Sequence, residues 1–267
     1  MPGLDPASIY ELPTGAGTMS PAMAEMQAYP RYLFDRVASH LGNRVWEIGV
    51  GFGTYTAWLS AAGKSVLATD IDRECLRQAA ERFFGNDRVH TAYVDLTDES
   101  TVRAQADFQA DSILCFNVLE HIPNDVAALV WLRESVAPGT VLGLIVPAHP
   151  SLFGRMDSEA GHFRRYTRKS LREALDRAGW HCDELRYINL VGAAGWWFHN
   201  RVRQSAGLED ASVNQQMRSA DRWLPRFARW TDPWCGRLAG LSVLAIARAE
   251  ARAAEAAGVS SSPSESC

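Results

Sequence analysis

The sequence predicts one α/β domain in which a seven-stranded, mostly parallel sheet carries helices on both faces. Two observations lead to this fold class. Short apolar segments alternate with helix-like segments along the chain, as expected for β-α-β units whose strands run parallel. The chain has 267 residues, of which 47% are hydrophobic, and this is enough to bury one sizeable core.

Seven apolar segments are expected to form the strands, at residues 44–48, 65–70, 89–94, 111–116, 140–146, 180–189 and 240–247. Helices are expected between them, at residues 54–62, 72–84, 125–136 and 167–178. Gly63, Gly85 and Gly179 end three of these helices. Parallel strands joined by right-handed crossovers place their carboxyl ends, and therefore a ligand site, along one edge, as in a Rossmann-like sheet.

Other segments lie outside this alternation. Residues 1–18 are rich in proline, glycine and small side chains and are expected to form a flexible leader. The domain is expected to span residues 19–250 and to begin with N-terminal helices, broken at Pro30. Residues 190–238 read as a helical, aromatic insert before the last strand, and residues 251–267 as a disordered tail.

The composition argues against several partners and compartments. A net charge of −4 gives no broad attraction to nucleic acid or to an anionic membrane. No segment has the pattern of a signal peptide or of a membrane-spanning helix. The five cysteines are dispersed and form no CxxC pair, so we expect reduced thiols and a cytoplasmic protein.

A glycine-rich turn follows the first expected strand. Glu47 is the last residue but one of the strand, and Gly49, Gly51 and Gly53 follow it with the spacing G-x-G-x-G. Glycines at such a bend let the backbone approach a ligand closely, although a plain tight turn would need them too. The dinucleotide fingerprint G-x-G-x-x-G is not matched, because a threonine stands at its sixth position.

Two acids sharpen this interpretation. Asp70 ends the second strand, where a carboxylate can accept hydrogen bonds from both hydroxyls of a ribose. Asp95 follows the third strand, where it can accept a hydrogen bond from an adenine amino group. Either acid alone would read as a surface residue or a helix cap. Together, at consecutive strand ends beside the glycines, they indicate an adenosine-containing ligand.

With these motifs the chain resembles class I methyltransferases that depend on S-adenosylmethionine (SAM). The likeness rests on V-W-E-I-G-V-G-F-G at 45–53, A-T-D-I-D at 68–72, V-D-L at 94–96 and F-N-V-L-E-H-I-P at 116–123. A finer likeness, through G-H-F-R-R-Y at 161–166, is to a bacterial subgroup with a GH-[FY]-RRY segment after the fifth strand. The resemblance implies methyl transfer with S-adenosylhomocysteine as product, and it names no acceptor.

The resemblance also implies roles for residues that match the family motifs. Those expected to bind SAM are Glu47, Gly49, Gly51 and Gly53 at its methionine part, Asp70 and Ile71 at its ribose, Asp95 and Leu96 at its adenine, and Asn117 at its amino group. In the family the leader often closes over the cofactor. Tyr29 and Tyr32 are the candidates for that position here.

Four side chains after the fourth and fifth strands are candidates for accepting a proton from the acceptor: His121, His149, His162 and Tyr166. Each has a structural alternative, such as capping a turn or packing in the loop. Arg164 and Arg165 either bind an anionic acceptor or pair with Asp157 and Glu159 to order the loop. No metal is expected, because the adjacent Glu120 and His121 cannot share a helix face as i,i+4 ligands would.

The insert carries a cluster of aromatic side chains and arginines, among them Trp196, Trp197, Phe198, Trp223, Trp230 and Arg226. It either covers an apolar acceptor, packs as an extra helical layer, forms a dimer contact, or contacts a membrane surface peripherally. We expect a SAM-dependent enzyme acting on a small aromatic or apolar metabolite. The alternatives are a lipid-linked or saccharide acceptor, or a SAM-binding partner protein without its own catalysis. The oligomeric state stays open.

Overall fold

The computed structural model describes residues 15–18, 20–190, 192, 211–236 and 238–251. Seven strands form one sheet in the order β3-β2-β1-β4-β5-β7-β6. They are β1 (Arg44–Ile48), β2 (Ser65–Asp70), β3 (Val89–Tyr93), β4 (Ser112–Phe116), β5 (Val141–Pro147), β6 (Trp180–Ile188) and β7 (Ser242–Ala249). Only β7 runs against its neighbours, pairing antiparallel with both β5 and β6. The predicted seven-stranded, mostly parallel, Rossmann-like sheet is confirmed.

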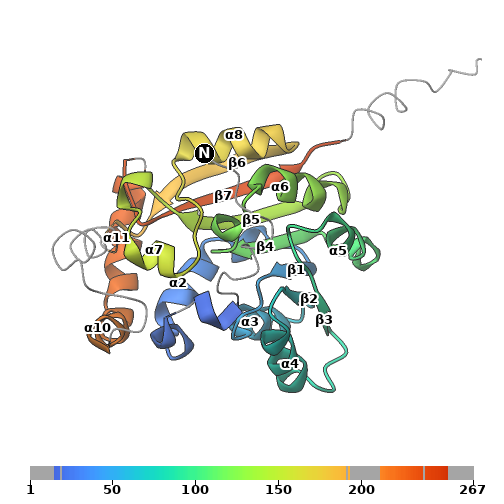
Figure 1. The fold of residues 1–267 in the computed structure, drawn as a ribbon, viewed down its shortest axis with the longest axis horizontal. Coiled ribbons are helices and arrows are strands. Elements are labelled where there is room, and N and C mark those ends of the chain that lie inside the picture. The colour runs from blue at the N-terminus through green and yellow to red at the C-terminus, as the bar shows by residue number, and fades with distance from the viewer. Residues whose placement is uncertain (1–14, 19, 191, 193–210, 237, 252–267) are drawn as a thin grey trace, which may run out of the picture.

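Helices cover both faces of the sheet (Figure 1). Those of one face are α5 (Glu99–Arg103), α6 (Asp125–Glu134) and α8 (Arg168–Arg177), and those of the other are α2 (Ala28–Asp35), α3 (Thr54–Ala61) and α4 (Arg73–Arg82). Each layer has its own apolar core. Val102, Leu129 and Leu171 are buried in the first, and Leu33 and Leu59 in the second. Together the two cores hold the sheet between the helical layers.

The strand order reverses next to β1, because β2 lies on one side of it and β4 on the other. In open α/β sheets a ligand binds at such a switch point, outside the carboxyl ends of the strands. The turns after β1 and β4 therefore frame the candidate site. Within the described residues no helix is long and apolar enough to cross a membrane.

The N-terminal segment differs from its prediction. Pro30 does not break a helix but lies in the first turn of α2, where a proline is tolerated because the missing N–H has no intrahelical partner. The break comes earlier, between a 3-10 helix at Pro21–Ala24 and the start of α2. Part of the leader also has structure, as Gly15–Thr18 form another 3-10 helix. Residues 1–14 lie outside the described part.

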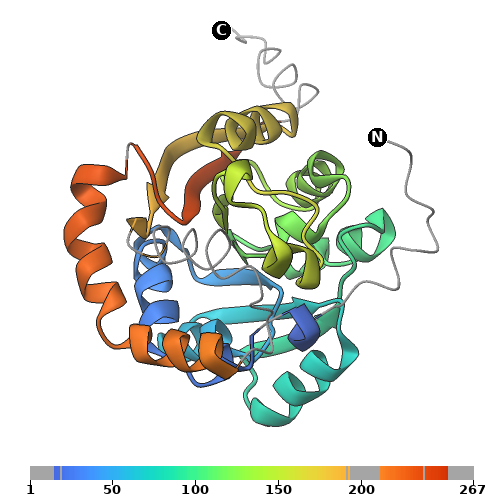
Figure 2. The ribbon, with the colours of Figure 1, turned by 60° about the vertical axis from the view of Figure 1, so that its left-hand side comes forward.

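The insert contributes two described helices, α10 (Ala211–Asp221) and α11 (Leu224–Cys235). Figure 2 shows them along the outside of the molecule, against the N-terminal segment. The side chain of Asp221 accepts hydrogen bonds from the amides of Gln27, Ala28 and Tyr29 and so caps α2. These helices therefore form an extra layer. Trp196, Trp197 and Phe198, like the tail at 252–267, lie outside the described residues.

Candidate functional site

The turn after β1 requires its three glycines. Gly49, Gly51 and Gly53 have φ values of 79°, 47° and 68°, a left-handed conformation that other residues rarely adopt. A Cβ atom at Gly49 would lie 2.6 Å from Cγ2 of Val118. Gly53 directly precedes α3, so the turn leads from a buried strand into a helix N-terminus. The backbone is thus open to a ligand at the point where the sequence predicted one.

Asp70 and Asp95 lie at the same edge of the sheet as this turn, at the carboxyl ends of β2 and β3. The carboxylate of Asp70 accepts hydrogen bonds from the amides of Gly51 (3.0 Å) and Asp72 (2.9 Å). Burial raises the pKa of Asp70, and these two amide donors act in the opposite direction. Asp95 accepts hydrogen bonds from the amide and the hydroxyl of Thr97, at 2.8 and 2.7 Å.

Both acids line a cavity of about 460 Å³. The predicted cofactor residues Gly49, Gly51, Asp70, Ile71, Asp95, Leu96 and Asn117 all contribute to its wall. Gly53 and Glu47 lie beside the lining residues Phe52, Thr54 and Ile48 but do not themselves line it. The structure therefore brings seven of the nine predicted cofactor residues to one cavity.

Several wall residues were not predicted. Gly15, Thr18, Met23 and Pro30 bring the N-terminal segment to the cavity, whereas Tyr29 and Tyr32 are not among the lining residues. Tyr32 instead donates a hydrogen bond from its hydroxyl to Asp232 of α11. The N-terminal segment thus contributes to the cavity wall, but not through the two tyrosines that were expected; closure over the cofactor stays a prediction.

An aromatic wall was also missed. Tyr55 and Phe116 line the cavity with their rings edge to face, 5.1 Å apart. They come from the helix after β1 and from the end of β4, and no short motif joins them. The sequence indicates this wall only by an aromatic residue beside the glycine turn and another beside Asn117.

Glu47 is buried behind the glycine turn. One of its carboxyl oxygens accepts a hydrogen bond from the hydroxyl of Thr56 at 2.5 Å, and the other has no partner among the described residues. Burial raises the pKa of Glu47 to about 8. The bond from Thr56 acts against this shift, and the nearby charge of Asp70 adds to it. The protonated form of this side chain therefore belongs to the folded state at neutral pH.

This pKa predicts a stability difference that depends on pH. The folded protein holds the Glu47 proton up to about pH 8, whereas the unfolded chain releases it near 4.5. Between these values folding takes up a proton, so wild-type stability falls as pH rises. Glu47→Gln carries no such penalty. Relative to wild type, its free energy of unfolding should therefore rise by about 4 kcal/mol between pH 5 and pH 9, at about 1.4 kcal/mol per pKa unit.

Urea unfolding at pH 5 and pH 9 measures this difference. Glu250→Gln makes the same chemical change on an exposed side chain and should track wild type at both pH values. If Glu47→Gln showed an equal difference from wild type at pH 5 and pH 9, the buried carboxyl would not be the source.

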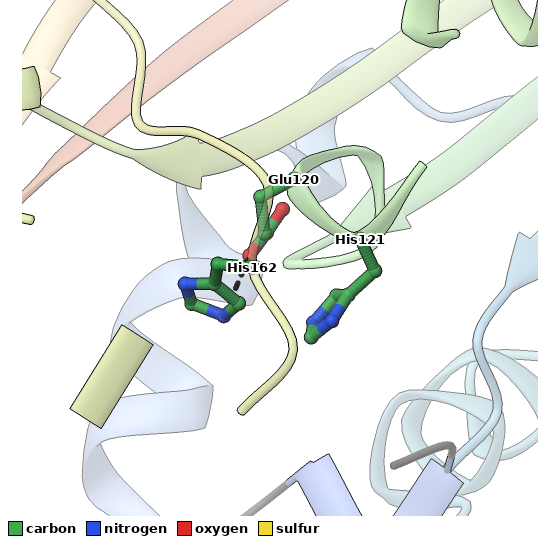
Figure 3. A group of neighbouring side chains, drawn as sticks. All are labelled: Glu120, His121 and His162. Carbon is green, nitrogen blue, oxygen red and sulfur yellow. Dashed lines mark ion pairs between the residues drawn. The ribbon is translucent and has the colours of Figure 1, made fainter. Parts of the chain in front are cut away.

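A second group of titratable side chains adjoins the cavity. Glu120, His121 and His162 each place a possible ligand atom within 4.8 Å of the others, and Figure 3 shows how these side chains lie together. His121 and Gly161 line the cavity. The rings of His121 and His162 are nearly perpendicular, with centroids 4.6 Å apart. Two of the four predicted catalytic residues therefore meet here.

Glu120 is the member of this group that was not predicted to take part in catalysis. Its side chain is fully buried, and neither carboxyl oxygen has a hydrogen-bond partner among the described residues. One oxygen lies 3.9 Å from Nε2 of His162. Burial raises the pKa of Glu120 to about 7, against the opposing charge of His162. The sequence pattern that could have indicated Glu120 is an apolar strand followed by an adjacent Glu-His pair.

Asp157 holds His162 in place. Its Oδ1 atom lies 2.9 Å from Nδ1 of His162 and 2.8 Å from Nε of Arg165, and Oδ2 accepts a hydrogen bond from the amide of Gly154. Burial alone would raise the pKa of Asp157, but the bond to His162 and the charge of Arg165 lower it overall. The predicted pairing of the loop through Asp157 is therefore present.

The ion pairs of Arg164 and Glu159 differ from the predicted ones. Arg164 lies 2.8 Å from Asp125 at the start of α6, whereas Glu159 pairs with Arg155. The Arg155–Glu159 pair spans i,i+4 on the short helix α7 (Arg155–Glu159), which the sequence had suggested only as loop. Both arginines of the G-H-F-R-R-Y segment thus pair with acids of the protein, as in the alternative in which they order the loop.

The other two catalytic candidates lie elsewhere. His149 stacks on Tyr187 of β6 with ring centroids 4.6 Å apart, and burial lowers its pKa. The hydroxyl of Tyr166 donates a hydrogen bond to Asp125 at 2.8 Å, and burial raises its pKa. Neither residue is among those that line the cavity. Their contacts fit the structural alternatives.

The cluster also has a donor set that can hold a metal. Two imidazoles and one carboxylate are ligands of Zn²⁺ and Fe²⁺ sites in other proteins. The adjacency of Glu120 and His121 does not exclude a metal site, because the residues need not share a helix face. A 3-10 turn at Leu119–His121 and the loop carrying His162 bring the three side chains together. The absence of a metal stays a prediction.

Burial holds His121 in its neutral form, because it lowers the pKa of this imidazole to about 3, with the nearby His162 adding to the shift. His121 is therefore a poor proton acceptor at neutral pH, although it stands on the cavity wall. His162, with its carboxylate partner, is the better placed base.

Comparisons with known proteins agree with this geometry. A family model described as a methyltransferase domain matches residues 11–185. The chain is 28% identical over 105 residues to a ubiquinone biosynthesis O-methyltransferase from Aromatoleum aromaticum, covering 39% of this chain and 44% of that protein. It is 37% identical over 62 residues to a demethylmenaquinone methyltransferase from Clavibacter sepedonicus, covering 23% and 25%. The chain thus spans less than half the length of these curated relatives.

A solved structure shares the fold. An S-adenosylmethionine-dependent methyltransferase from Mesorhizobium loti superposes with a TM-score of 0.53 at 14% identity, covering 81% of this chain and 97% of that one. At this identity the likeness concerns the fold alone. The family match is broader, because it includes the glycine turn, both acids and the Glu120–His121 pair. The chain therefore belongs to the methyltransferase-domain family and has the class I fold of SAM-dependent methyltransferases.

Proposed function

We propose that this protein transfers the methyl group of SAM to a phenolic oxygen of a small aromatic acceptor. The observation that carries the proposal is that the cluster of Glu120, His121 and His162 adjoins the cofactor cavity, whose wall includes His121 and Gly161. The partial relatives named for ubiquinone and menaquinone biosynthesis support an aromatic acceptor. The aromatic wall of Tyr55 and Phe116 suits a flat ligand.

The residues present fit SAM. A turn whose left-handed conformation favours glycine, two buried acids able to accept hydrogen bonds, and apolar walls meet in one cavity. Asp70 would accept the ribose hydroxyls, and Asp95 with Leu96 would hold the adenine. SAM supplies a methyl group that is already activated as a sulfonium. The protein therefore has to orient the acceptor, exclude water and take up a proton.

His162 is the proton acceptor in this proposal. Its Nδ1–H donates to Asp157, which leaves Nε2 with a free lone pair. A phenolic hydroxyl gives its proton to Nε2 as it is methylated, and the carboxylate of Asp157 stabilises the imidazolium that forms. Glu120, with a pKa of about 7, can hold or release a proton beside the same nitrogen near neutral pH.

Release of S-adenosylhomocysteine from the full chain tests the proposal. Catechols and hydroxybenzoates should support turnover, whereas the matched methyl ethers, which have no free hydroxyl, should not. Turnover with saccharide or lipid-linked acceptors in place of phenols would overturn the acceptor class. SAM binding without turnover on any acceptor would favour a SAM-binding partner protein.

The cysteines bear on where this reaction takes place. Cys115 and Cys182 are buried and form no disulfide within the described part of the chain, and we infer a reducing compartment such as the cytoplasm.

A further inference from the structure

The outer face of α11 exposes a continuous row of large apolar side chains. Trp223, Phe227, Trp230 and Trp234 are 46%, 54%, 72% and 79% exposed. Their spacing of four, three and four residues places them on one stripe of the helix. Leu238, just beyond the helix, is 79% exposed. We call these five side chains the aromatic stripe.

The aromatic stripe is not needed to hold α11 in place. The opposite face of the helix packs on the protein through Ala228 and Asp232, which are buried. Asp232 accepts hydrogen bonds from Tyr32 and from the amide of Asn189, and it pairs with Arg36 at 3.1 Å. The inner face is thus satisfied, and the three tryptophans of the outer face are left to solvent. Exposed large aromatics in a row mark an interaction surface.

Arginines flank the aromatic stripe. Arg222, Arg226 and Arg229 are exposed and lie along the same helix or directly before it. Arg229 pairs with Asp35 at 2.7 Å, whereas no acidic side chain of the described residues pairs with Arg222 or Arg226. The acids nearest in sequence, Asp221 and Asp232, point inward and are engaged. The local charge is therefore positive although the chain carries −4 overall.

We propose that the aromatic stripe binds an anionic lipid surface, with α11 lying in the plane of the headgroups. Tryptophan and phenylalanine side chains favour the boundary between headgroups and acyl chains, and arginines favour anionic headgroups. The alternative occupant, a second copy of this chain, fits less well. When two stripes pair with their helices antiparallel about a twofold axis, the arginine rows come to lie side by side, and no acid on the stripe could receive them.

The position of α11 connects this surface to the cavity. Both insert helices contact the N-terminal segment, through Asn214 with Ser20, Asp221 with α2, and Arg229 with Asp35. Met23 and Pro30 of that segment line the cavity. A bilayer on the outer face of α11 would thus contact the helix that packs against the segment forming one wall of the cofactor site. Access of an apolar acceptor from the membrane rests on the proposed function, but lipid binding itself does not.

Sedimentation of the full chain with phospholipid vesicles tests the proposal. The protein should sediment with vesicles of phosphatidylcholine and phosphatidylglycerol, and salt should weaken the binding. Trp230→Glu with Trp234→Glu should lower the partition coefficient at least about tenfold, because two large apolar side chains no longer enter the boundary. Arg222→Glu with Arg226→Glu should reduce binding to anionic vesicles and leave binding to phosphatidylcholine nearly unchanged.

The matched control is Phe84→Glu, which changes an aromatic side chain that is 93% exposed beyond α4 and should bind vesicles like wild type. Calorimetric SAM binding shows that each variant is folded and is independent of turnover. Equal vesicle binding by wild type and the double tryptophan variant overturns the proposal, as does no binding by wild type. A dimer that dissociates only in the tryptophan variant assigns the stripe to a second copy instead.

Discussion

Replacing Asp70 by alanine should weaken SAM binding by about tenfold to a hundredfold, as measured by calorimetry. The carboxylate lies in the cavity wall and holds the amide of Gly51 at 3.0 Å, so it fixes the glycine turn as well as offering acceptors for the ribose. Losing a buried hydrogen-bonded partner costs about 1–3 kcal/mol. The amide of Asp72 also loses its acceptor, which adds to the loss of order at this edge.

Two further variants test whether the carboxylate of Asp70 accounts for the loss of SAM affinity. Asp70→Asn keeps one carbonyl acceptor and should lie between wild type and the alanine variant. Asp107→Ala removes an exposed acid that does not line the cavity, and this variant should bind SAM like wild type. Unchanged affinity in Asp70→Ala, with the protein folded, would exclude a role for this carboxylate in binding the cofactor.

The sheet could be predicted because its strands are short apolar runs bounded by glycines and polar residues. β1 and β2 have the predicted bounds, and most other strands differ by one or two residues at an end. The two five-residue helices α5 and α7 were missed, because they are held by tertiary contacts and have too little apolar periodicity of their own. The predicted helix break at Pro30 was wrong because the position of a proline within a helix cannot be read from the sequence alone. A proline near a helix start and one in a helix interior look alike in sequence.

The cofactor side could be predicted because its residues follow consecutive strands, and the topology brings strand ends together. The cluster of Glu120, His121 and His162 could be predicted only in part, because its members come from segments with no shared period; His121 and His162 were among the candidates and Glu120 was not. Glu120 and His162 meet only after the loop between β5 and α8 folds back over the end of β4, where the amide of Phe163 donates to the carbonyl of Glu120. His149 follows the end of β5, yet its ring stacks on Tyr187 and does not join the cluster.

Replacing His162 by alanine should reduce kcat by about 10²- to 10⁴-fold, the usual contribution of a positioned acid or base. SAM affinity should change by less than about twofold, because His162 is not among the residues that line the cofactor cavity. Asp157→Asn should reduce kcat in the same direction, since the imidazolium would lose the carboxylate that stabilises it. Single-turnover kinetics with the best phenolic acceptor gives the rate of the methyl transfer step itself.

The controls separate this role from the alternatives. His181→Ala removes an exposed histidine of β6 and should leave kcat unchanged. His149→Ala should affect thermal stability more than kcat, because its ring packs on Tyr187. Equal losses of turnover and SAM affinity in His162→Ala would make His162 a structural residue of the loop. If wild type lost turnover on dialysis against a chelator and regained it with Zn²⁺, the cluster would act by holding a metal, because a proton acceptor needs none.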